Sequence, residues 1–521
     1  MLVVIDASEP SGNSAWARLY AALAVAALLC VLANRILGPS DAWDQTQPIT
    51  IAYTTDMLVN GRWIVPRDRN GKPATKPPLY NWMAAPAVAA AGHASELAHK
   101  LPSVVALVLC FGAVVVLGRR VIPGALSNGA GWLAGVMFLA NYTIFKIGYL
   151  ARPDMLLVLW MFVGWAVATA LLIPRIDARQ PWLALTFWGC VGLAALTKGP
   201  AMLPLVLYAI VGPRLVAGRW GASRVFFWSW GPAVALAGIS AWLYGVWRIA
   251  PDHMTDELWW REIVGHVTGI GSSPRGPFAL IATAPNMAWY YIARFEPWCI
   301  FAILAAWRLR TRGAPTGPRR WRSMGRTGVW LHGAAIFVVL MIASYTLVAN
   351  KRADYLAPAY PPSTLLAAWW LLQAPSWRRW LPVVFAPLVL AGLTVYNALE
   401  PAAPFRGFGN TITDFAGSVH ARVEADPAPI VCRKTGYTHF ESLLGYTGRT
   451  DRHAVAEAVE TGRPFWLVIG SWKTETTERH LRQIGPDVDL TEACRSRLVP
   501  SSKYWPVEVV LYRINVSPRI Q

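Results

Sequence analysis

The sequence predicts a mostly helical protein, in which a polytopic transmembrane helical bundle is followed by a small extracytoplasmic α/β domain. Of its 521 residues 55% are hydrophobic, and the mean hydropathy of +0.36 is well above that of a soluble globular chain. The apolar residues form long runs separated by short basic loops, and shorter mixed segments replace these runs from about residue 400. We therefore predict a membrane domain over residues 1–399 and a soluble domain over residues 400–521.

Eleven apolar runs approach the roughly 20 residues that a helix needs to cross a bilayer. Breaks in the chain at Lys198-Gly199-Pro200 and at Arg294, Glu296 and Pro297 allow a total of about 11–13 spans. The first run lacks a small-residue cleavage site, so we expect a retained span and not a removed signal peptide. The runs lie at residues 15–37, 101–118, 125–148, 155–174, 182–197, 199–213, 226–248, 280–307, 328–348, 355–374 and 380–397.

Clusters of arginine predict the orientation of these spans. They follow alternate spans, and the longest cluster, residues 308–326, contains no acidic residue. Because positive loops stay in the cytoplasm, we place this face and the N-terminus there. The opposite face receives the loops at 38–77 and 249–279 and the C-terminal domain. The same clusters account for the net charge of +19, so we exclude a nucleic-acid partner.

The C-terminal domain reads as a compact α/β module. Residues 429–435, 464–472 and 507–514 are strand-like, and residues around 452–460 and 474–484 are helix-like. No catalytic motif stands in it. Its two cysteines, Cys432 and Cys494, could form a disulfide if the domain lies in an oxidising compartment. Their spacing in the sequence does not decide whether they do.

The loop after the first span predicts a short amphipathic helix on the membrane surface. Pro48 suits its start, and Asn60-Gly61 suits its end. Asp44 stands just before this helix, where it either caps the helix or takes part in chemistry. The sequence of this loop, taken by itself, favours the interpretation that Asp44 caps the helix.

Ionisable residues collect at the outer ends of the spans, where lipid makes them costly. Lys198 is the most telling, because it interrupts an otherwise apolar run. Lysine and arginine bind phosphate, so acids among many cations suit a large anion held beside a general base. The simpler alternatives are interfacial anchoring and local ion pairs. The acids are Asp44 and Asp154, and the cations are Lys76, Arg152, Lys198, Arg261, Lys351 and Arg352.

Seven short motifs follow one another over about residues 15–375: MLVNGRWIVP, KPPLYNW, ARPDMLL, LTKGP, WWREIVGH, RFEPW and NKRADYLAPAYP. In this order they resemble the polyprenyl-phosphate-dependent glycosyltransferases of the GT-C class, most of all the bacterial lipid A aminoarabinose transferases and more distantly the protein O-mannosyltransferases. The resemblance implies transfer of a sugar, with inversion, from a polyprenyl-phosphate donor. The acceptor that it implies is a lipid, a glycan or a protein on the periplasmic face of a bacterial inner membrane.

The resemblance also assigns roles to residues. Asp44 corresponds to the proposed base or acceptor-positioning group, and Asp154 to a second aspartate of the family. Lys76 and Lys198 would hold the donor phosphate, with Arg261, Lys351 and Tyr355 nearby.

This sequence departs from the family pattern at several positions. Counting back from Met57 places Thr46 and Gln47 where the family has Asp-Glu, so the choice of base between Asp44 and Asp154 stays open. Thr75 and Arg275 stand at the metal positions of the aminoarabinose transferases, so no zinc site like theirs and no certain cofactor is predicted. A divalent metal at another site, with His266 as a candidate ligand or proton carrier, is left open.

Two other functional classes compete with an enzyme. A transporter or flippase of lipid-linked sugars would also bind phosphate through cations, but it should show mid-membrane charges and paired halves, which the sequence lacks. A scaffold that presents the C-terminal domain would not need Asp154 or Lys198. We therefore favour a glycosyltransferase.

Overall fold

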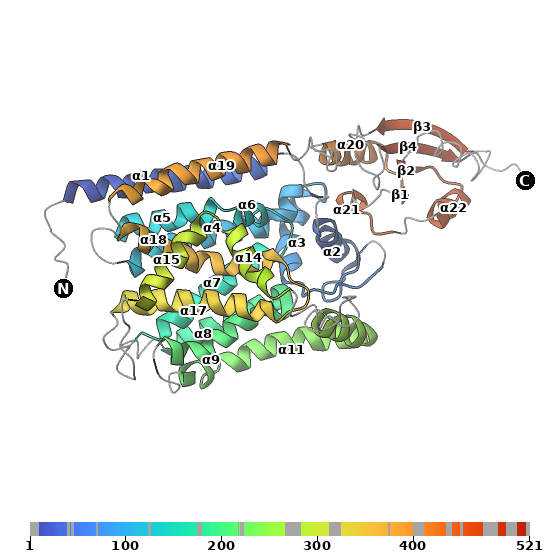
Figure 1. Ribbon diagram of the computed structural model, residues 1–521. Helices are drawn as coiled ribbons and strands as arrows, with labels where there is room; N and C mark the ends of the chain where they lie inside the picture. The colour runs from blue at the N-terminus through green and yellow to red at the C-terminus, as the bar shows by residue number, and fades with distance from the viewer. Residues whose placement is uncertain are drawn as a thin grey trace, which may run out of the picture.

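The computed structural model shows a helical bundle with a small sheet domain beyond one end (Figure 1). All eleven predicted apolar runs fall on helices, so the predicted fold class is confirmed. The structure describes residues 10–38, 42, 46–68, 71–122, 127–173, 180–216, 218, 223–265, 283–311, 325–373, 376–399, 411–433, 440–448, 452–471, 488–495 and 508–516.

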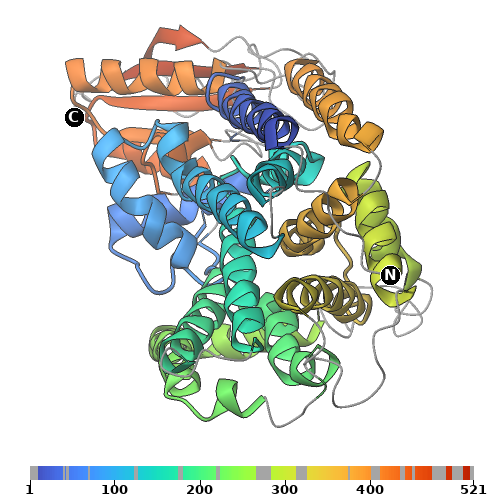
Figure 2. The same ribbon diagram turned by 90° about the vertical axis from the view of Figure 1, so that its left-hand side faces the viewer.

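The helices of the bundle lie side by side, and Figure 2 shows several of them nearly end-on. They are α1 (Pro10–Ile36), α4 (Glu96–Val121), α5 (Ser127–Leu139), α6 (Tyr142–Ile147), α7 (Asp154–Leu171), α8 (Gln180–Lys198), α9 (Leu203–Leu215), α10 (Arg224–Phe227), α11 (Gly231–Ile249), α14 (Pro285–Arg294), α15 (Trp298–Thr311), α17 (Arg326–Thr346), α18 (Tyr360–Leu372) and α19 (Leu381–Leu399). Three short 3-10 helices of the described chain are η2 (Gly199–Met202), η5 (Ala353–Ala359) and η6 (Ser376–Trp380), and the π-helix η4 (His253–Gly265) follows α11.

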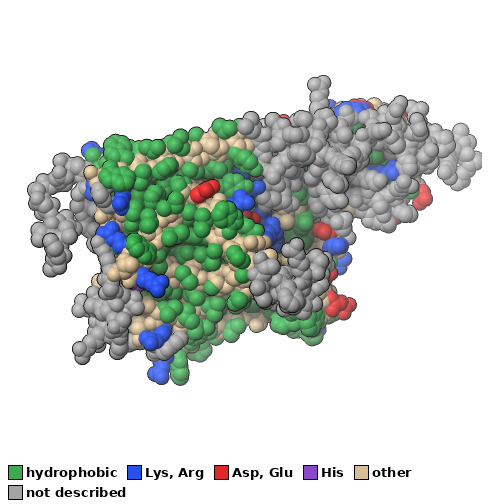
Figure 3. Space-filling view, in the orientation of Figure 1, with side chains coloured by type: hydrophobic (Ala, Val, Ile, Leu, Met, Phe, Trp, Pro, Cys, Tyr) green, Lys and Arg blue, Asp and Glu red, His purple; other side chains and the backbone are tan. Residues whose placement is uncertain are grey.

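Six helical stretches of the described chain are long and apolar enough to cross a membrane. Apolar side chains cover most of the flank of the bundle, and several basic ones lie near its end away from the sheet domain (Figure 3). The chain is therefore a multi-pass membrane protein. The six stretches are Ser14–Ile36, Glu96–Val121, Asp154–Leu171, Pro181–Leu215, Arg326–Thr346 and Ser376–Ala398.

The stretch Pro181–Leu215 contains a sharp turn. α8 ends at Lys198, and Gly199 adopts a φ of 58°, which few other residues tolerate. A methyl group added at Gly164 of α7 would meet Cys190 of α8 and also Leu205 of α9, so α8 and α9 reach the same level of α7. The two are therefore antiparallel limbs, as the separate runs at 182–197 and 199–213 predicted.

Two further predicted spans, at 125–148 and 280–307, are each interrupted in the middle. Residues at one interruption form hydrogen bonds with residues at the other. α5 gives way to α6 at Ala140–Asn141, and α14 gives way to α15 at Phe295–Pro297. The Trp298 indole donates to the Ala140 carbonyl over 2.6 Å, and the Asn141 amide donates to the Arg294 carbonyl over 2.5 Å. Backbone groups released at a break inside a membrane need such partners, because lipid offers none.

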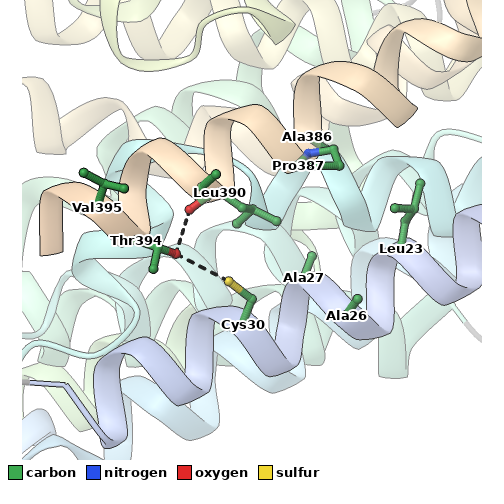
Figure 4. A pocket seen from close by; sticks show the side chains of 10 residues that line it. Leu23, Ala26, Ala27, Cys30, Ala386, Pro387, Leu390, Thr394 and Val395 are labelled. Carbon is green, nitrogen blue, oxygen red and sulfur yellow. Dashed lines mark hydrogen bonds between the residues drawn. The ribbon is translucent and has the colours of Figure 1, made fainter. Parts of the chain in front are cut away.

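The first and last spans, α1 and α19, pair at one edge of the bundle and are tied by polar contacts. Asn34 Nδ2 donates to Thr394 Oγ1 over 3.1 Å, and Asn397 Nδ2 donates to the Asn34 carbonyl over 2.9 Å. Arg35 Nη1 donates to Asn397 Oδ1 over 2.6 Å. Next to these contacts the two helices enclose an almost wholly apolar cavity of about 440 Å³ (Figure 4). Its walls include Leu23, Ala26, Ala27, Cys30, Ala386, Pro387, Leu390 and Thr394.

The C-terminal domain contains a four-stranded sheet in the order β1-β2-β4-β3, with only the β1–β2 pair parallel. The elements are α20 (Thr411–Ala425), β1 (Ile430–Arg433), α21 (Phe440–Leu443), α22 (Arg452–Glu460), β2 (Phe465–Ser471), β3 (Val488–Arg495) and β4 (Glu508–Val516). The three predicted strands and the predicted helix at 452–460 are confirmed. The predicted helix at 474–484 lies outside the described residues, and α20 and β3 were not predicted from the sequence.

The strand order also decides the question of the cysteine pair. Cys432 lies on β1 and Cys494 on β3, with β2 and β4 between them. Neighbouring strands are about 4.8 Å apart, whereas a disulfide needs Cα atoms within about 7 Å. Cys432 and Cys494 therefore do not form a disulfide with each other.

The helix predicted in the first loop is α2 (Gln47–Asn60), which ends at Gly61 with a φ of 67°. The sequence predicted a helix on the membrane surface, but in the structure the C-terminal domain packs against α2. Ile51 of α2 shares a buried cluster with Phe415, Val419 and Leu443 of the C-terminal domain. Thr55 Oγ1 also donates to the Ser442 carbonyl over 3.0 Å.

Candidate functional site

An ion cluster lies at the end of the bundle nearest the C-terminal domain. Its centre is Asp154, the first residue of α7, whose Oδ2 lies 2.9 Å from Arg152 Nε. Lys198, the last residue of α8, donates to Asp154 Oδ1. Arg152 Nη2 also lies 3.5 Å from Asp354 Oδ2 in η5. Three residues predicted for the site, Arg152, Asp154 and Lys198, are thus in direct contact.

The cluster runs from the protein interior toward the surface. The side chains of Arg152 and Asp154 are each 3% exposed, Lys198 is 13% exposed and Asp354 is 29% exposed. Buried charges are stable only when they are paired. The inner members therefore hold one another, and the ammonium group of Lys198 lies nearer the surface.

The Tyr355 ring packs against the Lys198 ammonium, and the Tyr345 ring packs against Tyr355. The Lys198 ammonium lies 4.9 Å from the centre of the Tyr355 ring, a distance at which a cation is attracted to the ring face. The rings of Tyr345 and Tyr355 are 5.3 Å apart, and Tyr345 donates to the Ala201 carbonyl over 3.0 Å. Tyr355 therefore belongs to the cluster, as the resemblance implied.

Lys76 reaches the cluster along the proline-rich approach that precedes α3 (Leu79–Ala91). Pro78 is the N-cap of this helix. Lys76 is half-buried and lies within electrostatic range of Asp154. It provides a third cation beside the same carboxylate.

Lys351 and Arg352 lie at the edge of this group. Lys351 Nζ donates to Thr283 Oγ1 and to the Val348 carbonyl, each over 2.9 Å, and partial burial lowers the pKa of its ammonium group. Lys351 thus fixes the residue two positions before α14. Arg352 is exposed to solvent.

The remaining predicted site residues are not described. Asp44, His266 and Arg275 lie outside the described residues, and Arg261 lies in η4 with a side chain that is not described. In the part of the chain that the structure describes, no group of three or more His, Cys, Asp or Glu side chains is placed to hold a metal ion.

A buried clamp holds the turn that presents Arg152 and Asp154, and sequence reasoning missed it. Ser103 Oγ donates to the Leu150 carbonyl over 2.6 Å and to the Arg152 carbonyl over 3.1 Å. Tyr80 also donates to Leu150, over 3.3 Å. From the other side, Gln47 Oε1 accepts the Ala151 N–H over 2.8 Å.

The sequence held one signal for this clamp. Gln47 stands where the family has glutamate, and its amide oxygen supplies the acceptor that a carboxylate would supply. Ser103 gives no such signal, because a single serine in an apolar helix is ordinary. All three clamp side chains are buried, so their hydrogen bonds are made away from water.

The charges of the cluster favour an anionic ligand. Arg152, Lys198 and Lys76 carry three positive charges, and Asp154 and Asp354 carry two negative charges, which leaves one net positive charge. Asp154 is already ion-paired with two cations, so it orients them and is a poor proton acceptor in this state. Lys198 and Lys76 are more exposed than Arg152, and lysine binds phosphate as a point charge.

Comparison with known proteins finds similarity to bacterial arabinosyl transferases. No family model matches the chain. Undecaprenyl phosphate-alpha-4-amino-4-deoxy-L-arabinose arabinosyl transferase 2 of Proteus mirabilis is 23% identical over 283 residues, which cover 52% of this chain and 47% of that protein. The corresponding transferase of Erwinia tasmaniensis is 23% identical over 335 residues, covering 62% of this chain and 54% of that protein. The chain spans about half the length of these curated relatives.

The fold matches a solved structure over nearly its whole length. ArnT from Cupriavidus metallidurans bound to undecaprenyl phosphate is similar with a TM-score of 0.65 and 17% identity, covering 96% of this chain and 98% of that chain. Its apo state gives a TM-score of 0.63. The chain therefore has an ArnT-like fold, and the resemblance predicted from the motifs is confirmed.

Proposed function

We propose that this chain is an integral-membrane glycosyltransferase of the GT-C class. It transfers a sugar from a polyprenyl-phosphate donor to a lipid, glycan or protein acceptor. The observation that carries this proposal is the cluster of Lys198, Arg152 and Lys76 around one carboxylate, at the end of a lipid-embedded bundle. The relatives act on an undecaprenyl phosphate-linked sugar by name, which supports a donor of that chemistry.

The cations serve the leaving group in this proposal. The bond between the anomeric carbon and the phosphate oxygen breaks while an acceptor oxygen attacks from the opposite side, with inversion. Negative charge grows on the lipid phosphate, and Lys198 and Lys76 stabilise it. Tyr355 limits where the Lys198 ammonium can move, and Asp154 with Arg152 fixes it from the other side.

A proton must leave the acceptor hydroxyl in the same step. We assign it to Asp44, because the carboxylate of Asp154 is already occupied by two cations. Arg261, Lys351 and Arg352 are further candidates for binding the donor headgroup.

The proposal includes an orientation in the membrane. The cluster and the C-terminal domain lie at one end of the bundle, and we assign the arginine-rich loops to the other. With those loops in the cytoplasm, the reaction takes place on the periplasmic face of a bacterial inner membrane, and the N-terminus is cytoplasmic. We propose residues 1–399 as the membrane domain and residues 400–521 as a periplasmic domain that covers α2.

Binding and transfer assays on the purified chain test this function. Undecaprenyl phosphate is the probe for binding, and mass spectrometry of glycolipids and glycans from cells with and without the chain identifies the product. Lys198→Gln should weaken binding of the probe at least about tenfold, because it removes a charged hydrogen-bond donor. Asp44→Asn should abolish transfer and leave binding intact.

Arg310→Gln is the matched control, since Arg310 is an exposed cation in the last turn of α15. Unchanged transfer by Asp44→Asn would refute the assigned base. Unchanged binding by Lys198→Gln, or identical glycans with and without the chain, would refute the function. Movement of the probe across a vesicle membrane without sugar transfer would instead favour a flippase.

A further inference from the structure

The chain between α2 and α3 forms a short hairpin that ends just before Lys76. The Ala74 N–H donates to the Pro66 carbonyl over 2.8 Å, and Arg67 pairs with Pro73 in an isolated antiparallel bridge. Lys76 therefore lies two residues beyond a backbone position that the hairpin fixes.

The residues that enter this hairpin pack against the junction of α11 and η4. Val65 is buried in one cluster with Val246 of α11 and Leu258 of η4. Next to this cluster the Trp242 indole of α11 donates to the Ile64 carbonyl over 3.4 Å. The entry of the hairpin is therefore supported by elements from a distant part of the chain.

His253 makes the corresponding contact at the exit of the hairpin. Its Nε2 donates to the Ala74 carbonyl over 3.0 Å, since a carbonyl oxygen can only accept. His253 and Ala74 are 8% and 6% exposed, so this hydrogen bond is made away from water. It joins the first residue of η4 to a position two residues before Lys76.

A short and stiff segment leads from this hydrogen bond to α3. Pro77 and Pro78 are both buried, and Pro78 is the N-cap of the helix. Proline fixes its own φ and restricts the residue that precedes it, which is here Lys76. The backbone of Lys76 is thus held by the His253 contact on one side and by the start of α3 on the other.

The position of this backbone decides where the Lys76 ammonium can lie. Lys76 is half-buried and lies within electrostatic range of Asp154, the centre of the ion cluster. A lysine side chain is a flexible stem, so its backbone must be fixed if the charge is to stay at one place. Small displacements of a group that stabilises developing charge lower the rate of a reaction steeply.

A purely structural role for His253 would also explain a buried hydrogen bond to a carbonyl. Such a role predicts a loss of stability that does not depend on Lys76. The bond acts at the exit of the hairpin, next to Lys76, whereas the entry is already held by Ile64 and Val65. The two roles therefore differ in what they predict for a chain that lacks the Lys76 charge.

We propose that His253 is a positioning residue, which holds Lys76 in place to bind the donor phosphate. Through the Ala74 carbonyl it fixes the backbone from which the Lys76 ammonium reaches the ion cluster, and it needs no contact with the donor. The inference rests on the proposed function for the role of Lys76, whereas the hold of His253 on Ala74 can be tested apart from that function.

Two substitutions separate the hydrogen bond from the bulk of the histidine ring. His253→Leu removes the donor, and His253→Gln keeps an amide donor at about the reach of Nε2. We expect His253→Leu to weaken binding of undecaprenyl phosphate about fivefold, and His253→Gln to bind within about twofold of wild type. Thr255→Val is the control on η4, because the Thr255 hydroxyl is exposed and donates to the neighbouring Pro251 and Asp252 carbonyls.

Combination with Lys76→Gln distinguishes positioning from a general loss of stability. Lys76→Gln alone should weaken binding of undecaprenyl phosphate about tenfold. Adding His253→Leu to it should change binding by less than about twofold, because the charge that His253 positions is already gone. Additive losses in the double variant, or full binding by His253→Leu, would overturn the inference.

Hydrogen exchange over residues 72–82 gives a readout that needs no donor. Exchange should be faster in His253→Leu and unchanged in His253→Gln and Thr255→Val, and unchanged exchange in His253→Leu would also overturn the inference. A wild-type chain that binds no undecaprenyl phosphate would refute the proposed function, and exchange would still decide whether His253 holds Ala74. If His253→Leu folds poorly, His253→Asn takes its place, because its shorter amide falls short of the Ala74 carbonyl.

Discussion

At the scale of single residues, Asp154 is more important to the site as a counter-ion than as a free base. It neutralises Arg152 deep in the protein and holds Lys198 by its other oxygen. Removal of one partner from a buried charge network leaves the others without compensation, which costs about 3–5 kcal/mol. The sequence identified these residues, but it did not show that they touch.

Asp154→Asn should therefore destabilise the protein as well as impair transfer. We expect a lower melting temperature of the solubilised chain, because two cations lose their shared carboxylate. Adding Lys198→Gln should cost less than the sum of the two single changes, as thermal unfolding of all four variants would show. A normal melting temperature for Asp154→Asn, together with complete loss of transfer, would instead make Asp154 the base.

Ser103→Ala tests the clamp on the turn that carries Asp154. The change removes a donor to the Arg152 carbonyl and one of two donors to the Leu150 carbonyl. An unsatisfied buried acceptor costs about 1–3 kcal/mol, so we expect a lower melting temperature and weaker binding of undecaprenyl phosphate. Ser418→Ala is the control, because that exposed hydroxyl bonds only within α20. Equal behaviour of the two variants would show that the clamp is dispensable.

At the scale of elements, close helix packing depends on particular glycines. Gly131 of α5 and Gly118 of α4 face each other, and a methyl group added at Gly131 would lie 2.2 Å from the Val115 carbonyl. Small residues permit such approach between membrane helices. In contrast, a methyl group added at Gly112 of α4 would meet nothing within 4 Å.

These two glycines give a matched pair of substitutions. Gly131→Ala should force α4 and α5 apart and destabilise the protein by about 1–3 kcal/mol. Gly112→Ala should be neutral or slightly stabilising, because alanine is the better helix former. Melting temperatures in one detergent compare the two, and a loss of stability in Gly112→Ala equal to that in Gly131→Ala would contradict the packing.

At the scale of the whole molecule, the C-terminal domain and the bundle meet at a pair of histidines. His93 precedes α4 and lies against Gly445, while His420 Nε2 of α20 donates to the Leu443 carbonyl over 3.1 Å. Burial lowers the pKa of His93, and the nearby His420 lowers it further. His99 and Lys100 stand on the bundle side of the same region.

Docking of the C-terminal domain should therefore weaken in acid. A histidine with a lowered pKa takes up its proton more readily when the contact is open, so its contribution is complete above pH 6.5 and is lost as the pH falls below that value. Hydrogen exchange of α20 and α21 should rise between pH 7.5 and pH 5.5. His93→Gln should flatten this dependence, and an identical pH profile in that variant would contradict the role of His93.

The sequence by itself determined where the apolar helices lie and the end of the bundle at which the ionisable residues gather. These properties are local, because transfer of a segment into lipid and the bias of positive charge depend on the residues of that segment and its flanks. The order of the motifs also determined the class of relative, even though Asp44 stands two residues from the family position.

Only the tertiary structure decided which charges meet and which stand apart. Arg152, Asp154 and Lys198 come from the ends of two helices, and no pattern within either helix encodes the distance between them. The clamp by Gln47 and Ser103, the packing of α2 under the C-terminal domain and the separation of Cys432 from Cys494 likewise depend on contacts between distant segments. Such contacts are set by how whole helices and strands pack, which composition and periodicity do not specify.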